Sequence, residues 1–202
     1  MTDRLPATDD GIARASVLLS GGGIVAFPTD TVYGVAVAAG RADRLPALFE
    51  LKRRPPDKAI PILVASPAQI PAGWVIDERA HRLIEAHWPG PLTLVLASAS
   101  GSTTQAFRAP DHPVALRLIQ AAGPLLATSA NLSGDPDTLA ADDVLIAFAT
   151  QQDELAAVLD GGVVPGGVAS TVLDLSEVPA RILREGPITR GALAAMVDIG
   201  DR

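Results

Sequence analysis

Cysteine is absent from the 202-residue chain, which excludes disulfides, thiolate nucleophiles and cysteine-based metal sites. Aromatic residues make up only 3% of the sequence, so the core must be built from aliphatic side chains. No apolar run approaches the roughly 20 residues of a membrane-spanning helix. Residues 1–10 lack the basic and apolar regions of a secretion signal. We therefore expect a cytoplasmic protein that makes no contact with a membrane.

Several common site motifs are also missing. The glycine run 21–23 is not followed by the Gly-Lys-Ser/Thr of a phosphate-binding loop, and no Gly-x-Gly-x-x-Gly follows an expected strand. The three histidines, His81, His87 and His112, do not have the spacing of metal ligands. No nucleophile elbow is present either. These absences leave the polar loops of the chain as the places to look for function.

The composition favours one α/β domain. Hydrophobic residues make up 48% of the chain and the mean hydropathy is +0.29, which is sufficient for a buried core. The net charge of −7 and the pI near 4.8 argue against a protein that coats nucleic acid, but they allow a local basic patch. We expect a single domain over residues 1–202, with an ordered core over about 11–197, built as a twisted mixed β-sheet flanked by helices.

Periodicity and turn residues predict the elements of this domain. The expected helices cover residues 11–20, 41–54, 77–88, 113–121, 142–150 and 189–197, and the expected strands cover 24–27, 35–38, 60–65, 92–96, 124–127, 158–160, 170–175 and 181–184.

Lysine is also scarce, and its position is informative. Lys52 and Lys58 are the only lysines, and they lie with two arginines in a stretch of seven residues. Pro55 and Pro56 cannot continue a helix, so the sequence predicts a helix that ends in exposed cations before a rigid loop. Such a segment could bind an anionic ligand. The alternative is a solvated basic helix end that only complements the helix dipole.

Four polar segments lie at the ends of expected elements, at residues 28–34, 52–58, 128–131 and 170–171. They offer hydroxyls, basic groups, and a hydroxyl and an amide two residues apart on one side of an extended segment. Each segment alone could be an ordinary turn. Four of them at the strand ends of an α/β sheet predict a ligand crevice with a basic concave face.

The order of motifs resembles that of the YrdC-like threonylcarbamoyl-AMP synthase family along nearly the whole chain. The matching segments are Pro28-Thr29-Asp30-Thr31-Val32-Tyr33-Gly34, Lys52-x-Arg54-Pro55 with Lys58, Trp88-Pro89-Gly90-Pro91-Leu92-Thr93, Arg108-Ala109-Pro110-Asp111-His112-Pro113, Ser129-Ala130-Asn131-Leu132-Ser133-Gly134, Ser170-Thr171-Val172 and Arg184-Glu185-Gly186.

The resemblance implies a nucleotidyltransferase activity. The family forms threonylcarbamoyl-adenylate and pyrophosphate from L-threonine, bicarbonate or CO₂, and ATP, for the threonylcarbamoyl modification of adenosine in tRNA. Mg²⁺ would arrive with ATP rather than in a dedicated protein site. Proteins that transfer the threonylcarbamoyl group to tRNA are the expected downstream partners, and direct contact with tRNA would be weak.

The resemblance also implies roles for particular residues. The family's two basic residues with Ser and Asn would be Lys52, Arg54, Ser129 and Asn131, as the catalytic set. The further implied contacts are, with ATP, Arg54, Lys58, Ser129, Asn131, Ser133 and Arg184, and, with L-threonine, Thr31, Arg108, Ala127 and Ser170.

The chain departs from the family pattern at two positions. Ala169 replaces a glutamate that usually precedes the Ser-Thr pair, and Leu63 stands at about the position of a histidine found in many members. Both departures bear on threonine contacts. Because the chain ends near residue 202, we expect the short form of the family, without the additional C-terminal domain.

Three alternatives compete with this interpretation. A related carbamoyl-transfer domain of hydrogenase maturation proteins tends to carry Gly at the position of Ala130 and belongs to a far longer chain. A paralogue of unknown role typically lacks the Ser-x-Asn pair, which is intact here. A non-catalytic RNA-binding module of the same fold is the third alternative, and the acidic net charge and the complete tetrad argue against it.

Overall fold

The computed structural model describes residues 2–55, 58–151 and 153–200. Its elements, in chain order, are β1 (Asp3–Pro6), α1 (Asp9–Ser20), β2 (Ile24–Phe27), β3 (Gly34–Ala38), η1 (Ala39–Arg44), α2 (Leu45–Leu51), β4 (Ile62–Leu63), η2 (Pro67–Gln69), α3 (Glu78–His87), β5 (Leu92–Ala97), β6 (Thr104–Arg108), α4 (Pro113–Ala122), β7 (Leu125–Ser129), α5 (Ala141–Ala147), β8 (Leu155–Asp160), β9 (Thr171–Asp174), β10 (Arg181–Arg184) and α6 (Arg190–Ala194).

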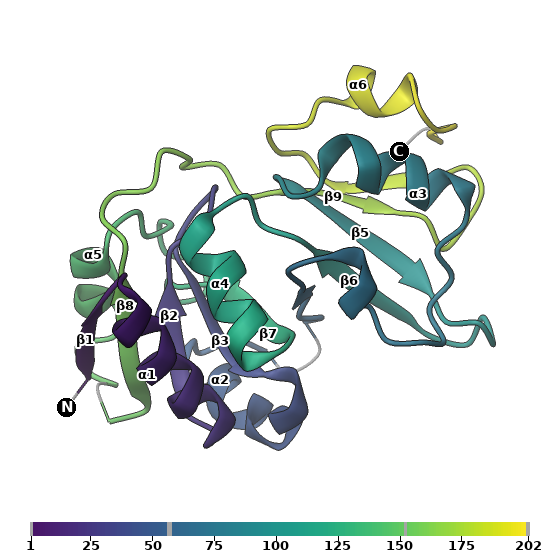
Figure 1. Cartoon of the computed structure of the whole chain (residues 1–202). Coiled ribbons are helices and arrows are strands. Elements are labelled where there is room, and N and C mark those ends of the chain that lie inside the picture. The colour runs from purple at the N-terminus through teal and green to yellow at the C-terminus, as the bar shows by residue number, and fades with distance from the viewer. Residues whose placement is uncertain (1, 56–57, 152, 201–202) are drawn as a thin grey trace.

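The strands form one mixed sheet in the order β1-β8-β2-β3-β7-β4-β6-β5-β9-β10 (Figure 1). Four neighbouring pairs are parallel, namely β1–β8, β8–β2, β4–β6 and β5–β9, and the other five are antiparallel. The predicted fold class, a single α/β domain with a mixed sheet flanked by helices, is confirmed.

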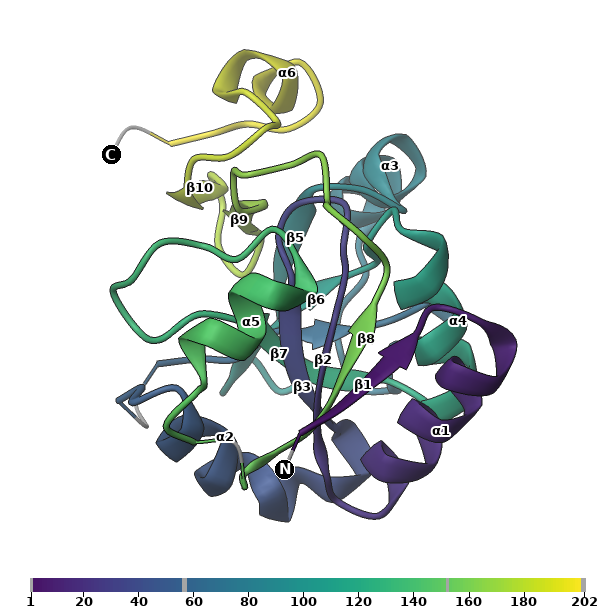
Figure 2. The same ribbon diagram turned by 90° about the vertical axis from the view of Figure 1, so that its left-hand side faces the viewer.

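Helices cover both faces of the half that contains β2, β3, β7 and β8 (Figure 2). Side chains of α1 and α4 pack on one face, together with Val25 and Phe27. Side chains of α2 and α5 pack on the other, together with Ile24 and Ala26. Because successive strand residues point to opposite faces, a strand buried on both faces is apolar throughout, as the sequence of β2 is.

The other half of the sheet is covered on one face by α3 and α6. Leu92, Leu94 and Leu96 of β5 and Phe107 of β6 point into this layer. The intervening residues of the same strands point to the opposite face. That face forms one wall of the cavity described below.

Two of the predicted helices, at 77–88 and 189–197, begin where the structure shows a capping residue. The hydroxyl of Thr189 accepts a hydrogen bond from Ala192 N at the start of α6. Asp77 caps α3 in the same way, by accepting from Ala80 N at 2.9 Å. Each cap satisfies a backbone N–H that has no partner within the helix.

The structure corrects several of the predicted elements. The helix predicted over 189–197 ends at Ala194, and the strand predicted over 158–160 begins at Leu155. The helix expected over 41–54 is a 3₁₀ segment followed by α2, because the backbone at Arg41 is not helical, and α2 ends at Leu51. The strand expected over 60–65 is reduced to Ile62–Leu63. The predicted α5, over 142–150, ends at residue 147. Positions 56 and 57 of the basic segment lie outside the described residues.

Two strands, β1 and β6, were not predicted. In β1 only Leu5 is buried, since the strand lies at the edge of the sheet, and such a polar segment has no strand-like alternation of apolar residues. Strand β6 begins with exposed Thr104 and ends with the buried Arg108. Its pairing with β5 and β4 is a tertiary event that its own polar sequence does not signal.

Within the described part of the chain, no helix has both the length and the apolar character that crossing a membrane requires.

A strained residue ends α2. Arg53 has φ of +48°, a left-handed conformation that suits glycine at this position of a helix end. Its N–H donates to Glu50 O at 3.0 Å, and Arg54 N donates to Phe49 O at 2.8 Å. This is the hydrogen-bond pattern of a Schellman motif. The turn at Arg53 directs its two basic neighbours, Lys52 and Arg54, to different surroundings.

We predict that Arg53→Gly stabilises the fold. Relief of the left-handed strain, about 1–2 kcal/mol, should exceed the extra backbone entropy of glycine in the unfolded chain, about 0.5–1 kcal/mol. The free energy of unfolding, measured by urea titration, should rise by about 0.5–1 kcal/mol. Arg53→Ala, which keeps the Cβ atom, is the control and should give no such gain. Equal gains in both variants would show that the charge, not the backbone, is responsible.

Candidate functional site

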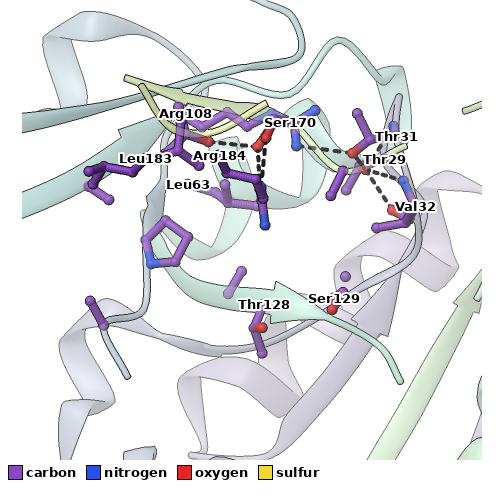
Figure 3. A pocket seen from close by; sticks show the side chains of 18 of the residues that line it. Thr29, Thr31, Val32, Leu63, Arg108, Thr128, Ser129, Ser170, Leu183 and Arg184 are labelled. Carbon is purple, nitrogen blue, oxygen red and sulfur yellow. Dashed lines mark hydrogen bonds between the residues drawn. The ribbon is translucent and has the colours of Figure 1, made fainter. Parts of the chain in front are cut away.

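A cavity of about 390 Å³ lies between the two halves of the sheet (Figure 3). Thr128 and Ser129 of β7 lie on one side, and Arg108, Ser170 and Arg184 lie on the other. Segments far apart in the sequence therefore meet here. The lining residues are Thr29, Thr31, Val32, Gly34, Arg54, Ala59, Pro61, Leu63, Thr93, Val95, Ala106, Arg108, Ala127, Thr128, Ser129, Asp137, Ala169, Ser170, Val172, Leu183 and Arg184.

The loop between β2 and β3 is ordered by a buried hydroxyl. Thr29 Oγ1 donates to Val32 O at 2.6 Å and accepts from the backbone N–H groups of Thr31 and Val32. The loop 161–167 packs against it, where Gly167 N donates to Thr31 O at 2.8 Å. A Cβ atom on Gly166 would collide with Thr31 O. These contacts fix the Thr31 side chain at the cavity wall.

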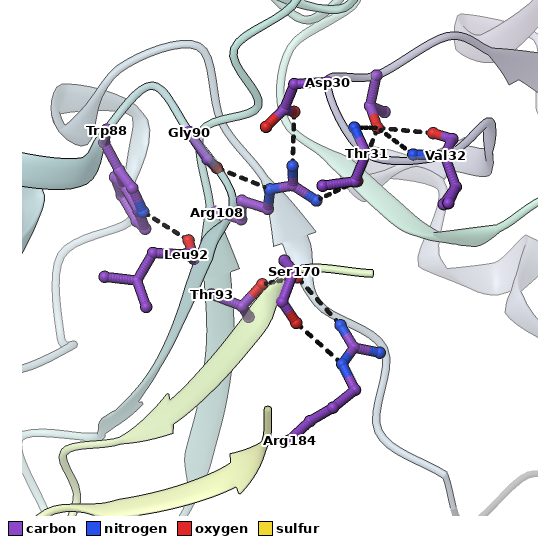
Figure 4. Close-up of polar contacts among 11 residues, drawn as sticks. Asp30, Thr31, Val32, Trp88, Gly90, Leu92, Thr93, Arg108, Ser170 and Arg184 are labelled. Atoms are coloured by element: carbon purple, nitrogen blue, oxygen red, sulfur yellow. Dashed lines mark hydrogen bonds and ion pairs between the residues drawn. The ribbon is translucent and has the colours of Figure 1, made fainter. Parts of the chain in front are cut away.

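Arg108, at the end of β6, is buried and bonds through all three of its nitrogens (Figure 4). Nη1 donates to Thr31 Oγ1 at 3.0 Å, Nη2 donates to Asp30 Oδ1 at 2.5 Å, and Nε donates to Gly90 O at 3.0 Å. Burial lowers the pKa of Arg108, and the charge of Asp30 opposes that shift. Each terminal nitrogen keeps one further N–H for a ligand.

Lys52 is not the exposed cation that the sequence predicted. Its side chain is only 1% exposed, and its Nζ donates to Ser129 O, to Asn131 O at 2.6 Å and to Asn131 Oδ1 at 3.4 Å. Helix α2 ends at Leu51, one residue before Lys52, and the chain turns so that the lysine points into the protein. An ammonium has three N–H groups, so these acceptors account for all of them.

Burial lowers the pKa of Lys52 to about 8, and the nearby charge of Arg54 adds to the shift. Asp137 opposes both effects. The Lys52 ammonium therefore loses its proton at a lower pH than the ammonium of an exposed lysine does. An anion bound in the cavity would raise the pKa again.

Ser129 and Asn131 form a short network above this ammonium. Ser129 Oγ donates to Asn131 Oδ1 at 2.6 Å, and Asn131 Nδ2 donates to Asp135 O at 2.6 Å. Ser133 N donates to Lys52 O at 3.0 Å, which ties the following loop to the end of α2. Lys52 thus fixes the backbone that presents the Ser129 hydroxyl to the cavity.

Arg54 lies at the cavity wall with unused donors. Nη2 donates to Ala59 O at 2.9 Å, whereas the buried Nε has no hydrogen-bond partner among the described residues. Burial lowers the pKa of this guanidinium as well. A buried polar atom without a partner is costly, and an anionic oxygen in the cavity would satisfy it.

Ser170 connects two further residues of the cavity. Arg184 donates through Nε to Ser170 O at 2.9 Å and through Nη2 to Ser170 Oγ at 3.0 Å. The same Oγ lies 2.8 Å from Thr93 Oγ1 (Figure 4). Both hydroxyl residues are buried. Ser170, the residue before β9, therefore fixes the position of Arg184 on β10.

The structure brings most of the predicted site residues to one cavity. Seven of them line it: Thr31, Arg54, Arg108, Ala127, Ser129, Ser170 and Arg184. Lys52 and Asn131 lie behind its wall, in contact with Ser129, while Lys58 and Ser133 are exposed and are not among its lining residues. Both departures from the family pattern, Leu63 and Ala169, line the cavity.

Sequence reasoning gave no role to three residues of this site. Thr29 orders its loop, Asp30 pairs with Arg108, and Asp137 lines the cavity. Thr29 and Asp30 lie in the motif at 28–34, so their position was available as a signal. Asp137 lies in a loop with no distinguishing pattern, and only the fold brings it to the cavity.

Among the described residues, no three histidine, aspartate or glutamate side chains are grouped as metal ligands would be. The charge lining the cavity comes from three arginines and Asp137. The site is therefore suited to anionic oxygens, such as those of phosphates and carboxylates.

Known proteins resemble this chain in fold and in sequence. The structure of Pyrococcus abyssi Sua5 complexed with L-threonine superposes with a TM-score of 0.88 at 34% identity, over 99% of this chain and 62% of that one. A Bacillus subtilis threonylcarbamoyl-AMP synthase is 38% identical over 98% of this chain and 59% of its own length. The chain thus spans about three fifths of the length of these two relatives.

A relative of similar length is also known. The threonylcarbamoyl-AMP synthase of Xanthomonas campestris is 35% identical over 92% of this chain and all of its own length. The profile of the Sua5/YciO/YrdC family, described as telomere recombination, matches residues 17–186. The chain therefore belongs to the Sua5/YciO/YrdC family.

Proposed function

We propose that this protein is an L-threonylcarbamoyladenylate synthase, a nucleotidyltransferase that forms threonylcarbamoyl-AMP and pyrophosphate from L-threonine, bicarbonate or CO₂, and ATP. The observation that carries the proposal is the convergence of Arg54, Arg108 and Arg184 on one cavity in a chain of net charge −7. The relatives named for this activity, and the solved relative in complex with L-threonine, support it.

The reaction has two steps. The amine nitrogen of threonine attacks the carbon of CO₂, a C–N bond forms, and a proton leaves the nitrogen to give a carbamate. A carbamate oxygen then attacks the α-phosphorus of ATP, a new P–O bond forms, and the bond to the β-phosphate oxygen breaks to release pyrophosphate. Positioning and charge stabilisation are the main tasks of a protein in such a displacement.

The residues divide between these tasks. Arg54 offers its unpartnered Nε and Arg184 its cationic charge to phosphoryl oxygens. Thr31, Arg108 and Ser170 would hold the threonine, and Ala127 would provide contact area. Ser129 would orient the carbamate and phosphate groups, and Lys52 and Asn131 would hold Ser129 in place.

Lys58 and Ser133 would contact ATP only from the rim of the cavity, since both are exposed. Mg²⁺ would enter as part of its ATP complex, bound by the triphosphate, and is a substrate component in this proposal. We further propose that the adenylate is passed to proteins that modify tRNA in the cytoplasm.

We predict that pyrophosphate release from ATP requires both L-threonine and bicarbonate. The purified protein should release pyrophosphate with the complete mixture, and omission of either co-substrate should reduce the rate to background, because the carbamate is the nucleophile. Release that continues unchanged without threonine would contradict the proposal. Binding of tRNA without any ATP turnover would favour a non-catalytic RNA-binding module instead.

We predict that Lys52→Arg lowers both activity and stability. The wider guanidinium must replace a buried ammonium, so overpacking should lower the free energy of unfolding by about 1–3 kcal/mol. Displacement of the Ser129 backbone should lower kcat by about tenfold, or about 1.4 kcal/mol in the barrier. Thermal melting and steady-state kinetics measure both effects.

Arg14→Lys is the control for this prediction, because Arg14 is exposed on α1 and distant in the fold from the cavity. It should leave both quantities unchanged. Full turnover in Lys52→Arg would mean that the hydrogen bonds of Lys52 contribute nothing to catalysis.

We predict an alkaline decrease in kcat/KM near pH 8 that depends on Lys52, because kcat/KM reports the ionisation of the free enzyme, before a bound anion raises this pKa. The pKa of Lys52 is lower in the folded protein than in the unfolded chain. The free-energy cost of burying the ammonium is therefore fully present below pH 8 and decreases from about pH 8 to 10.5. Above pH 8 the neutral amine has only two N–H groups for three acceptors, and the hold on Ser129 weakens.

Lys52→Arg separates this effect from the titration of threonine itself. A guanidinium stays protonated, so the variant should lose the decrease near pH 8 and keep only the part that is common to both proteins. Identical pH profiles of kcat/KM in the two proteins would contradict the assignment to Lys52.

A further inference from the structure

Strand β5 carries one hydroxyl among aliphatic residues. Leu92, Leu94 and Leu96 point into the core under α3, while Thr93 and Val95 point to the cavity. Thr93 is only 3% exposed. Valine has nearly the same shape and would bury no polar group at this position. The hydroxyl of Thr93 therefore needs an explanation other than packing.

Its partner is supplied by the neighbouring strand. Strands β5 and β9 pair in parallel, with Thr93 opposite Val172, so the residue before β9, Ser170, lies beside Thr93. Thr171 N donates to Pro91 O at 2.9 Å and fixes this register. The two hydroxyl oxygens are 2.8 Å apart. The pairing of the strands, rather than chance rotamers, brings them together.

Arg184 limits the hydrogen bonds that Ser170 Oγ can make. A guanidinium can only donate, so one lone pair of Ser170 Oγ is occupied by Arg184 Nη2. A hydroxyl that accepts from a cation becomes a better donor. Either hydroxyl could donate in the contact between Thr93 and Ser170. An anionic oxygen in the cavity would attract the Ser170 hydrogen, and Thr93 would then donate to the second lone pair of Ser170.

One hydroxyl hydrogen then remains without an acceptor. With both lone pairs of Ser170 occupied, by Arg184 and Thr93, its O–H can point only in the remaining direction. Within the described part of the chain, neither hydroxyl has another hydrogen-bond partner. Both residues line the cavity. The remaining O–H is therefore suited to an anionic oxygen bound there.

We propose that Thr93 is a positioning residue that acts through Ser170: it fixes the rotation of the Ser170 hydroxyl so that this hydroxyl donates to an anionic oxygen of the bound amino acid. The proposal rests on the proposed function, in which Ser170 contacts L-threonine. Thr93 itself need not touch the substrate. Its role is to present a donor that is already oriented, which reduces the entropy lost on binding.

The test is a double-mutant cycle on Thr93→Val and Ser170→Ala, with Michaelis constants measured separately for threonine and ATP. Thr93→Val should raise the KM for threonine by about three- to tenfold, the loss of one buried hydrogen bond, and leave the KM for ATP nearly unchanged. In the Ser170→Ala background, Thr93→Val should have no further effect, because the residue on which it acts is gone.

Two further variants separate the hydroxyl from packing. Thr93→Ser keeps the hydroxyl and should restore the wild-type KM for threonine, whereas Thr93→Ala should resemble Thr93→Val. Thr150→Val makes the same chemical change at an exposed position and should behave as wild type. If Thr93→Val fails to fold, the Thr93→Ser and Thr93→Ala pair, confirmed as folded by thermal melting, carries the test.

The outcomes are distinguishable. Wild-type kinetics in Thr93→Val and Thr93→Ala would overturn the proposal, and so would multiplicative losses in the double variant, which would indicate that Thr93 contacts the ligand directly. A rise in the KM for ATP alone would show that the oxygen belongs to phosphate, which also overturns it. Absence of threonine-dependent pyrophosphate release in the wild-type protein would instead refute the proposed function.

Discussion

The buried ammonium of Lys52 joins the end of α2 to the end of β7, and the site depends on this contact. Three oxygens of Ser129 and Asn131 surround it, so the cation fixes the backbone that carries the Ser129 hydroxyl. A buried charge is costly unless it is fully hydrogen-bonded. Arg53 supports this arrangement, because its left-handed turn sends Lys52 inward and Arg54 toward the cavity.

The cavity forms because helices cover the two halves of the sheet differently. One half is covered by helices on both faces, whereas β5, β6 and β9 pack against helices with one face and line the cavity with the other. Alternation along these strands therefore sends Thr93, Val95 and Arg108 to the cavity and their neighbours to the core. Arg108 thus lies on a strand, which holds it more rigidly than a loop would.

The electrostatics of the cavity are local. The chain as a whole is acidic, yet three arginines reach this one concave surface and a lysine lies behind it. Burial lowers the pKa values of Lys52, Arg54 and Arg108, which means that their charges are poorly solvated in the free protein. An anionic substrate would replace the missing solvation. The burial that lowers the pKa values of these cations therefore also favours the binding of an anionic ligand.

Local sequence patterns were sufficient to predict the fold class, the starts of α3 and α6, the aliphatic strands and the motif order that identifies the family, because these features depend on residues close together in the chain. The sequence indicated Thr31, Arg108 and Ser170 as candidate binding residues, but it did not predict their contacts with one another or with Asp30 and Arg184. It was wrong about the exposure of Lys52, and it missed β1, β6 and Asp137. Tertiary structure decided these features, because the burial of a cation, the pairing of a polar strand and the place of a loop carboxylate depend on partners distant in the chain. The contact between Thr93 and Ser170 belongs to this second group, since only the pairing of β5 with β9 creates it.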